Sequence, residues 1–325
     1  MGGSMAQIAE FGRTAKGQRV DRITLRAGKL QVAVLTWGAV LQSVRLDGVP
    51  YDLTLGSQDL ADYEGALRYH GSIIAPVVNR ISNAAAPLDG KMLQFDVNFN
   101  GTHVLHSGSA GTQTKIWQVV QVNDSACTLA LDLPEGEGGF PGNRRVEAHF
   151  DLAPPARLRL TITVRTDAAT LWNATNHSYW NLDGTADFSG HRLRLAADHY
   201  LPATAEFIPT GEIREVADLF DFRKEKAVLP GKPDLDNCFC LSHAATDLRD
   251  VMVLRGQSGV EMTVATTEAG LQLYDCRHDG YKGLAVEAQG WPDAPNKPGF
   301  PAIALAAGQS RSQITEWRFA APALQ

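Results

Sequence analysis

The sequence lacks the long apolar and basic segments that mark several classes of protein. No window approaches the roughly 18 uninterrupted apolar residues of a membrane-spanning helix. The N-terminus has neither the basic start nor the apolar stretch of a secretory signal. No run of Lys or Arg is longer than the pair Arg144-Arg145, and the net charge is −6. We therefore expect a cytoplasmic protein that binds neither membranes nor nucleic acid.

Cysteine is scarce, and several catalytic motifs are missing. The four cysteines are irregularly spaced, which fits neither a disulfide framework nor a paired Cys-x-x-Cys zinc site. We expect buried free thiols at Cys127, Cys238, Cys240 and Cys276. The sequence has no Gly-x-Ser-x-Gly motif, no His-Glu-x-x-His motif and no phosphate-binding loop. We therefore expect no metal site and no cofactor.

The periodic signal that is present is that of β-strands. With 325 residues, of which 44% are apolar and 20% charged, the chain can bury a sizeable core. Turn signals such as Asp89-Gly90 and Asn100-Gly101 predict antiparallel neighbours. Two short stretches favour a helix, residues 57–65 with Ser57 as N-cap and residues 212–220. Apolar and polar residues alternate with a period of two, which predicts half-buried strands in residues 127–133, 146–152, 158–165 and 260–266.

Many strands and few helices predict an all-β fold, a large antiparallel β-sandwich with a few short helices. The sequence has no repeat of fixed period and no linker rich in Pro, Gly or Ser. We therefore expect a single domain over residues 5–325. Residues 1–4, which precede Met5, are interpreted as a remnant of a cloning sequence.

Five segments interrupt the alternation with clusters of polar, aromatic and turn-forming residues. In the first, Arg80 offers a planar fork of donors for neighbouring hydroxyls or a carboxylate, although a structural salt bridge is the simpler interpretation. His106 and His177 anchor the second and third segments. A lone histidine in a β protein is more often a satisfied polar group than a catalyst. The two asparagines, serine, tyrosine and tryptophan around His177 are nevertheless typical of surfaces that contact sugars.

The fourth and fifth segments supply carboxylates. Asp236 stands beside an apolar strand, and a turn aspartate and a ligand-binding group are equally good interpretations. Glu287 follows Val286 in an apolar strand that leads into a proline-rich loop. A strand glutamate bordered by apolar residues is costly unless it is paired or functional. Glu287 is therefore a candidate for acid/base chemistry.

These five segments, in this order, resemble the aldose 1-epimerase (galactose mutarotase) family across nearly the whole chain. Residues 176–182, Asn-His-Ser-Tyr-Trp-Asn-Leu, are similar to the family signature Asn-His-Ser-Tyr-Phe-Asn-Leu. Residues 287–296 are similar to its C-terminal Glu-x-Gln-x-x-Pro-Asp-Ala-x-Asn block. The resemblance implies the galactose mutarotase-like supersandwich fold. It also implies an enzyme that interconverts the α and β anomers of a free aldohexose, without metal or cofactor.

The resemblance also implies a role for each candidate residue. His177 is then the general acid and Glu287 the general base. Mutarotation needs one proton taken from the anomeric hydroxyl while another reaches the ring oxygen, so that the ring opens and recloses. The groups that the resemblance assigns to sugar binding are Asn79, Arg80, His106 and Asp236.

One position departs from the family pattern, and two other functions compete. Where the family has Gly-Arg shortly before its Asn-Arg pair, this chain has Ala75-Pro76. A customary guanidinium is therefore missing, and we expect broad recognition of sugar hydroxyls. A catalytically silent sugar-binding module has no need of a titratable acid opposite a titratable base. A glycoside hydrolase could use Asp236 and Glu287 as its two carboxylates, but the histidine signature is then unexplained. We expect a small sugar as partner and a monomer or homodimer.

Overall fold

The structure is a computed structural model that describes residues 7–321, and nearly all of its regular elements are strands. The largest sheet has nine strands in the order β10 (Gln118–Val122), β11 (Ala126–Leu133), β12 (Arg144–Ala153), β13 (Arg157–Thr166), β27 (Ser310–Ala320), β23 (Glu261–Thr266), β22 (Arg249–Arg255), β17 (Arg192–Leu195) and β20 (Lys226–Ala227). A six-stranded sheet has the order β16 (Tyr179–Trp180), β25 (Leu284–Gln289), β24 (Gly270–Tyr274), β21 (Asp236–Cys240), β18 (His199–Tyr200) and β19 (Arg214–Glu215). A four-stranded sheet contains β1 (Gln7–Arg13), β2 (Arg19–Ala27), β3 (Leu30–Leu35) and β4 (Leu41–Leu46).

Short elements complete the fold. Two-stranded pairs are formed by β5 (Ile73–Ile74) with β15 (Thr175–Asn176), β6 (Arg80–Ile81) with β9 (Val104–Leu105), β7 (Ala85–Leu88) with β8 (Lys91–Gln94), and β14 (Thr170–Leu171) with β26 (Ala304–Leu305). The single α-helix of the described residues is α1 (Leu60–Glu64). Short 3-10 turns are η1 (Ser82–Ala84), η2 (Gly108–Ala110), η3 (Thr112–Thr114), η4 (Glu137–Gly139), η5 (Asp218–Phe220), η6 (Arg277–Asp279) and η7 (Ala294–Asn296).

The period-two pattern builds the core, because one face of each half-buried strand is buried. In the antiparallel ladder between β12 and β13, Val146 lies opposite Val164 and Phe150 lies opposite Leu160, and all four side chains are buried. The intervening residues, such as Glu147, face outward. The strands that we predicted at residues 127–133, 146–152, 158–165 and 260–266 are therefore confirmed as β11, β12, β13 and β23.

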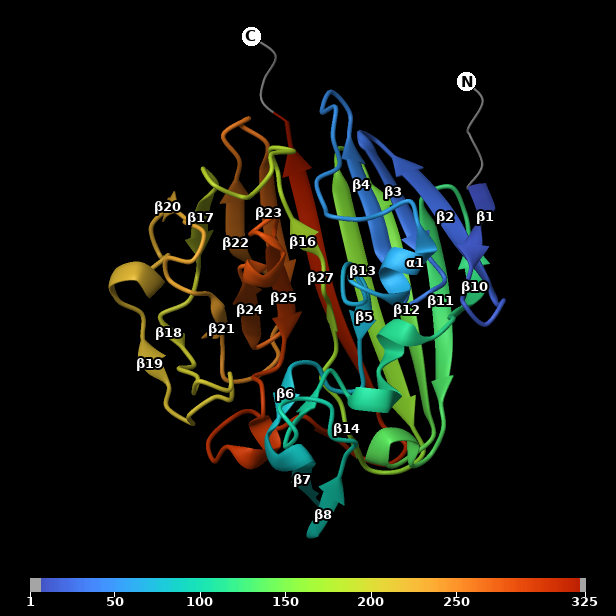
Figure 1. The fold of residues 1–325 in the computed structure, drawn as a ribbon, viewed down its shortest axis with the longest axis vertical. Helices are drawn as coiled ribbons and strands as arrows, with labels where there is room; N and C mark the ends of the chain where they lie inside the picture. Colours follow the sequence, from blue (N-terminus) through green and yellow to red (C-terminus); the bar gives the residue numbers. More distant parts are fainter. Residues whose placement is uncertain (1–6, 322–325) are drawn as a thin grey trace.

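The sheets pack as the layers of a sandwich. Trp180 of β16 packs against two side chains of β27, with ring centroids 5.8 Å from Trp317 and 5.6 Å from Phe319. One main core cluster takes residues from all three large sheets, from Ile23 near the N-terminus to Phe319 near the C-terminus. Figure 1 shows the four-stranded and six-stranded sheets side by side along the nine-stranded sheet. The predicted all-β antiparallel sandwich is confirmed.

The helix predictions were only partly right. Within residues 57–65 the helix is the short α1, and its N-cap is Asp59, whose side chain accepts from the backbone N–H of Ala61 at 3.0 Å. Ser57 is not the cap, because its hydroxyl accepts from the N–H of Asp59 instead. The helix predicted at residues 212–220 is wrong. That segment forms β19, which pairs with β18, followed by the 3-10 turn η5.

The buried free thiols predicted from the sequence are confirmed at three of the four cysteines. All four cysteines are free, and three of them are buried while Cys240 is partly exposed. No helix among residues 7–321 is long and apolar enough to cross a membrane. Residues 1–4, which we interpret as a cloning remnant, lie outside the described residues.

The alternation in β12 yields a stability prediction. Replacing buried Phe150 by Ala leaves a cavity in the main core, so Phe150→Ala should lower the free energy of unfolding by about 3–5 kcal/mol. Glu147 lies on the outward face of the same strand, and its ion pair with Arg145 is exposed. Glu147→Ala should therefore change the free energy of unfolding by less than about 1 kcal/mol. Urea unfolding followed by circular dichroism measures both. Equal losses in the two variants would contradict the assigned orientation of β12.

Candidate active site

A pocket of about 280 Å³ opens beside the six-stranded sheet, near the size of small ligand sites. Its lining includes residues of β24 and β25 and of the short strands β6 and β9. The structure brings all six candidate residues into this one pocket, namely Asn79, Arg80, His106, His177, Asp236 and Glu287. These residues are far apart in the sequence, so the fold is what assembles the site.

Asn79 and His106 hold each other through the backbone. The N–H of Asn79 donates to Nδ1 of His106 at 3.1 Å, and the N–H of His106 donates to the carbonyl of Asn79 at 2.9 Å. Both residues have left-handed backbones, with φ of 64° and 51°. Such conformations are uncommon outside glycine and concentrate at functional sites. Because Nδ1 of His106 accepts a hydrogen bond, its Nε2 carries the proton when the ring is neutral.

Arg80 is fixed between two aromatic rings. Its guanidinium carbon lies 4.6 Å from the ring centroid of Phe99 and 4.9 Å from that of Phe207. Its Nη2 lies 3.4 Å from Oδ2 of Asp236, and its Nη1 lies 3.4 Å from the side-chain oxygen of Asn79. The planar fork therefore stacks on two rings and forms the salt bridge of the simpler interpretation, and Arg80 also lines the pocket.

Asp236 is held on both carboxylate oxygens. Arg80 pairs with Oδ2, and Nε2 of Gln272 donates to Oδ1 at 2.7 Å. Burial raises the pKa of Asp236 above its ordinary value, while the nearby charge of Arg80 opposes that rise. Asp236 is thus no ordinary turn aspartate, because it begins β21 and lies in the pocket wall.

Glu287 and His177 meet at the base of the pocket. In β25, Val286 and Ala288 point into the main core, so Glu287 points to the opposite face and into the pocket. His177 stands between β15 and β16, where its N–H donates to the carbonyl of Ser72 at 2.9 Å. Its Nε2 lies 3.4 Å from Oε1 of Glu287, and both side chains are buried.

Burial sets the protonation of this pair. The pKa of Glu287 is well above its ordinary value, first because burial disfavours the carboxylate and then because Asp236 is nearby. Burial also lowers the pKa of His177 to about 3, with a smaller contribution from the charge of His70. When the pair holds one proton, burial therefore favours that proton on Glu287 rather than on His177, because both groups resist charge. Nδ1 of His177 and Oε2 of Glu287 have no hydrogen-bond partner among residues 7–321.

Two residues of the site were not predicted from the sequence: Gln272, which supports Asp236, and Arg277, which lines the pocket. Gln272 is the cross-strand neighbour of Glu287, and it holds Asp236. Arg277 lines the pocket within 6.0 Å of the ring centroid of Phe207 and forms an ion pair with Asp275 at 2.9 Å. The sequence could have predicted Gln272 as a site residue only if the pairing of β24 with β25, which places it beside Glu287, had been known. Arg277 follows the strand in a turn, and no pattern in the sequence distinguishes it.

The departure at Ala75-Pro76 does not lie in the pocket wall. Both residues are buried, and neither lines the pocket. The N–H of Ala75 donates to the hydroxyl of Thr112 at 3.0 Å, and the carbonyl of Pro76 accepts from the N–H of Asn173 at 2.8 Å. The guanidinium groups in the pocket wall are those of Arg80 and Arg277.

Comparisons with known proteins identify the family. The family model described as aldose 1-epimerase matches residues 21–318. The chain is 31% identical to galactose mutarotase from Rattus norvegicus, over 93% of this chain and 95% of that protein. It is 32% identical to aldose 1-epimerase from Escherichia coli (strain K12), over 94% of this chain and 96% of that protein.

Solved structures give the same result. A GalM/aldose epimerase homologue from C. elegans superposes with a TM-score of 0.85 at 27% identity, covering 92% of this chain and 98% of that one. Galactose 1-epimerase from Lactobacillus acidophilus superposes with a TM-score of 0.85 at 25% identity, covering 97% and 98%. The matched family model, the full-length similarity and the shared fold show that this chain belongs to the aldose 1-epimerase family and is a mutarotase, an isomerase that acts on carbohydrates.

Proposed function

We propose that this enzyme interconverts the α and β anomers of a free aldohexose of the galactose or glucose type, with His177 and Glu287 as its acid/base pair. The observation that carries the proposal is the 3.4 Å contact between these two buried groups inside a pocket of hydroxyl-binding side chains. The names of the rat and bacterial relatives, galactose mutarotase and aldose 1-epimerase, support the substrate class.

The chemistry requires two proton transfers, one at each of the two oxygens bonded to the anomeric carbon. Glu287 removes the proton of the anomeric hydroxyl, and His177 gives a proton to the ring oxygen, so the ring opens to an aldehyde. Rotation about the bond to the aldehyde carbon exposes its other face, and the reverse transfers close the ring as the other anomer. The two oxygens that exchange protons are bonded to the same carbon, so neighbouring acid and base groups can reach both.

The single proton of the pair supports this mechanism. Burial favours a carboxylic acid and a neutral imidazole, whereas the forward step uses a carboxylate and an imidazolium. The two states differ only by transfer of one proton across the 3.4 Å contact. Sugar hydroxyls that donate to Glu287 and accept from His177 stabilise the ionised state, because a charged group accepts or donates stronger hydrogen bonds.

Four other groups orient the sugar in this proposal. Asn79, Arg80, His106 and Asp236 lie around the pocket and carry donors and acceptors suited to ring hydroxyls. Arg277 adds a second guanidinium in the wall. Aromatic faces from Phe99 and Phe207 complete an environment typical of sugar sites. No metal or cofactor takes part in the proposed proton transfers.

The alternatives are less well supported. A silent binding module would gain nothing from burying an acid beside a base, since that burial is costly. A glycoside hydrolase would use Asp236 and Glu287, but Arg80 and Gln272 already occupy both oxygens of Asp236. The histidine would also have no role in that reaction.

We also propose that residues 5–325 form a single domain, which the main core running from Ile23 to Phe319 supports. We further propose a cytoplasmic enzyme that works as a monomer or homodimer on small sugars, without nucleic acid or membrane partners. The net charge of −6 and the lack of a basic run support this.

The acid/base roles predict the effect of two substitutions. His177→Asn and Glu287→Gln should each lower kcat by roughly 100-fold or more, because each removes a proton-transfer group. The double variant should be little worse than either single one, since the two groups act as a unit. Polarimetry of freshly dissolved α-glucose and α-galactose, corrected for the spontaneous rate, measures kcat.

The controls for these variants lie outside the pocket. His149→Asn on the outer face of β12 should keep the full rate. Calorimetry should show that sugar still binds to both active-site variants, which separates chemistry from binding. Full activity in either single variant would rule out the role assigned to that residue.

The shifted pKa values predict a broad pH profile. The active one-proton state of the pair exists above the pKa of His177, which is lowered to about 3, and below the raised pKa of Glu287. As the pH falls, kcat/KM should therefore show no acidic limb between about pH 5 and pH 7, where an ordinary histidine with a pKa of about 6.5 would titrate. The basic limb should lie well above the ordinary glutamate pKa. An acidic limb centred near pH 6 would contradict this assignment.

The engaged carboxylate of Asp236 predicts weak discrimination between epimers. Strong rejection of an epimer needs a buried polar group that the wrong hydroxyl leaves unpaired, but Asp236 already has partners on both oxygens. The kcat/KM values for glucose and galactose should differ by less than about tenfold, or roughly 1.4 kcal/mol. Asp236→Ala should raise KM for both sugars, whereas the exposed Asp132→Ala should not. A thousandfold preference, or unchanged kinetics in Asp236→Ala, would contradict this.

A further inference from the structure

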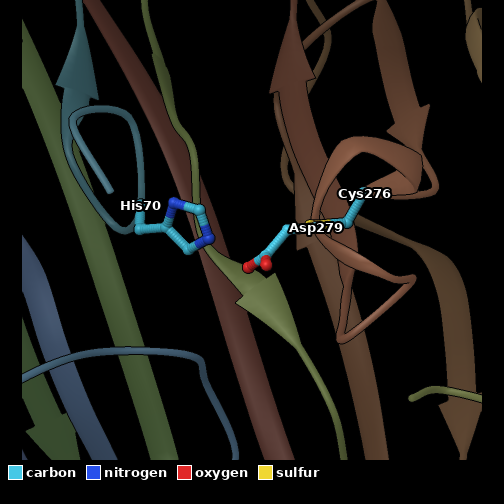
Figure 2. Close-up of side chains that lie close together, drawn as sticks. All are labelled: His70, Cys276 and Asp279. Carbon is cyan, nitrogen blue, oxygen red and sulfur yellow. The ribbon is translucent and has the colours of Figure 1, made fainter. Parts of the chain in front are cut away.

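Three potential metal ligands lie together behind Tyr179, outside the catalytic pair. They are His70, Cys276 and Asp279, and their ligand atoms all lie within 4.8 Å of one another. Figure 2 shows the imidazole of His70 and the carboxylate of Asp279 facing each other across a short gap, with Cys276 next to Asp279. None of the three lines the sugar pocket, so the cluster is separate from the site described above.

His70 is buried without a hydrogen-bond partner. It lies between α1 and β5, its ring stacks on Tyr179 with centroids 4.1 Å apart, and its exposed fraction is 6%. Neither Nδ1 nor Nε2 has a hydrogen-bond partner among the described residues, although both are buried. Figure 2 shows a ring nitrogen directed at Asp279. A buried polar group without a partner is costly, and metal ligation is one way to satisfy it.

Cys276 and Asp279 are brought together by one turn. The N–H of Asp279 donates to the carbonyl of Cys276 at 3.0 Å, at the start of η6 after β24. Cys276 has a left-handed backbone with φ of 54°, and it is buried. Lys282 lies 2.7 Å from Oδ1 of Asp279, but a carboxylate has two oxygens, so one can bind a metal while the other keeps this ion pair.

We propose that His70, Cys276 and Asp279 bind one zinc ion, through an imidazole nitrogen, the thiolate sulfur and a carboxylate oxygen. Zinc accepts this mixed set of nitrogen, sulfur and oxygen ligands and completes four-coordination with a water. Calcium and magnesium prefer sites made of oxygen ligands, which this cluster does not provide. On binding, the Zn–S bond forms as the S–H bond breaks, and the thiol proton leaves to solvent.

The ion connects two loops on either side of the pocket wall. His70 follows Tyr69, which lines the pocket. Cys276 and Asp279 lie on either side of Arg277 and His278, and both of these also line the pocket. The N–H of Gly71 donates to the carbonyl of His177 at 3.0 Å, so the same loop contacts the catalytic segment. Zinc therefore stabilises the wall around the sugar and takes no part in the proton transfers.

Zinc binding to the whole chain tests the proposal. Protein treated with chelator and a thiol-free reductant is titrated with zinc in competition with a chromophoric chelator. We expect one ion per chain and a rise in Tm of several degrees as zinc increases, because the ion binds the folded state. Cobalt in place of zinc should give a thiolate-to-metal charge-transfer band. No zinc binding and no such band in the unaltered chain would overturn the proposal.

Variants locate the ion. His70→Phe keeps an aromatic ring stacked on Tyr179 but removes both nitrogens, and Cys276→Ser removes the sulfur. Each should weaken zinc at least about tenfold, and Cys276→Ser should lose the cobalt band. Asp279→Asn, at a partly exposed position, should also weaken zinc and is the variant least expected to disturb folding.

Matched controls separate this site from others. His199→Phe changes an exposed histidine on β18, and Cys240→Ser changes a cysteine on β21. Both should bind zinc as the unaltered chain does, with circular dichroism confirming the fold of every variant. Unchanged affinity in His70→Phe, Cys276→Ser and Asp279→Asn would show that the ion binds elsewhere and would overturn the proposal.

Discussion

The burial of an acid and a base side by side is the constraint on which the site depends. Glu287 and His177 lie 3.4 Å apart in a place that disfavours charge on both. Such a pair needs rigid surroundings. If the two groups moved slightly apart, each would be buried without its partner, and the free energy of burying it would be less favourable. Two different parts of the fold supply it, the β25 strand under Glu287 and the β15 to β16 segment that carries His177.

The fold could be predicted from the sequence because burial on one face of a strand leaves a local period-two record. Val146 to Leu152 and Leu158 to Val164 show it clearly, and both became central strands. The prediction was wrong where tertiary pairing overrides local preference. Residues 212–220 favour a helix on their own, yet Arg214–Glu215 pair with β18. The short pairs that shape the pocket, such as β6 with β9, are too brief to leave a periodic signal.

Residue chemistry alone marked most of the candidate site, but the role of each residue came from the resemblance to the family. Chemistry alone left Arg80 and Asp236 undecided, because a structural salt bridge and a binding group use the same side chains. Their contact with each other and with Gln272 depends on register between strands far apart in the sequence. The cluster of His70 and Cys276 was invisible for the same reason, since the two residues are separated by most of the chain and follow no ligand spacing.

The stacking of Arg80 between Phe99 and Phe207 has a consequence for how tightly a sugar binds. A free arginine side chain has about 2 kcal/mol of rotamer entropy, part of which is lost when it grips a ligand. Here most of that freedom is already lost on folding. The entropy loss therefore lowers the free energy of unfolding and does not weaken sugar binding. Removing the rings of Phe99 and Phe207 would therefore return this freedom to Arg80 in the folded chain and weaken the binding of sugar.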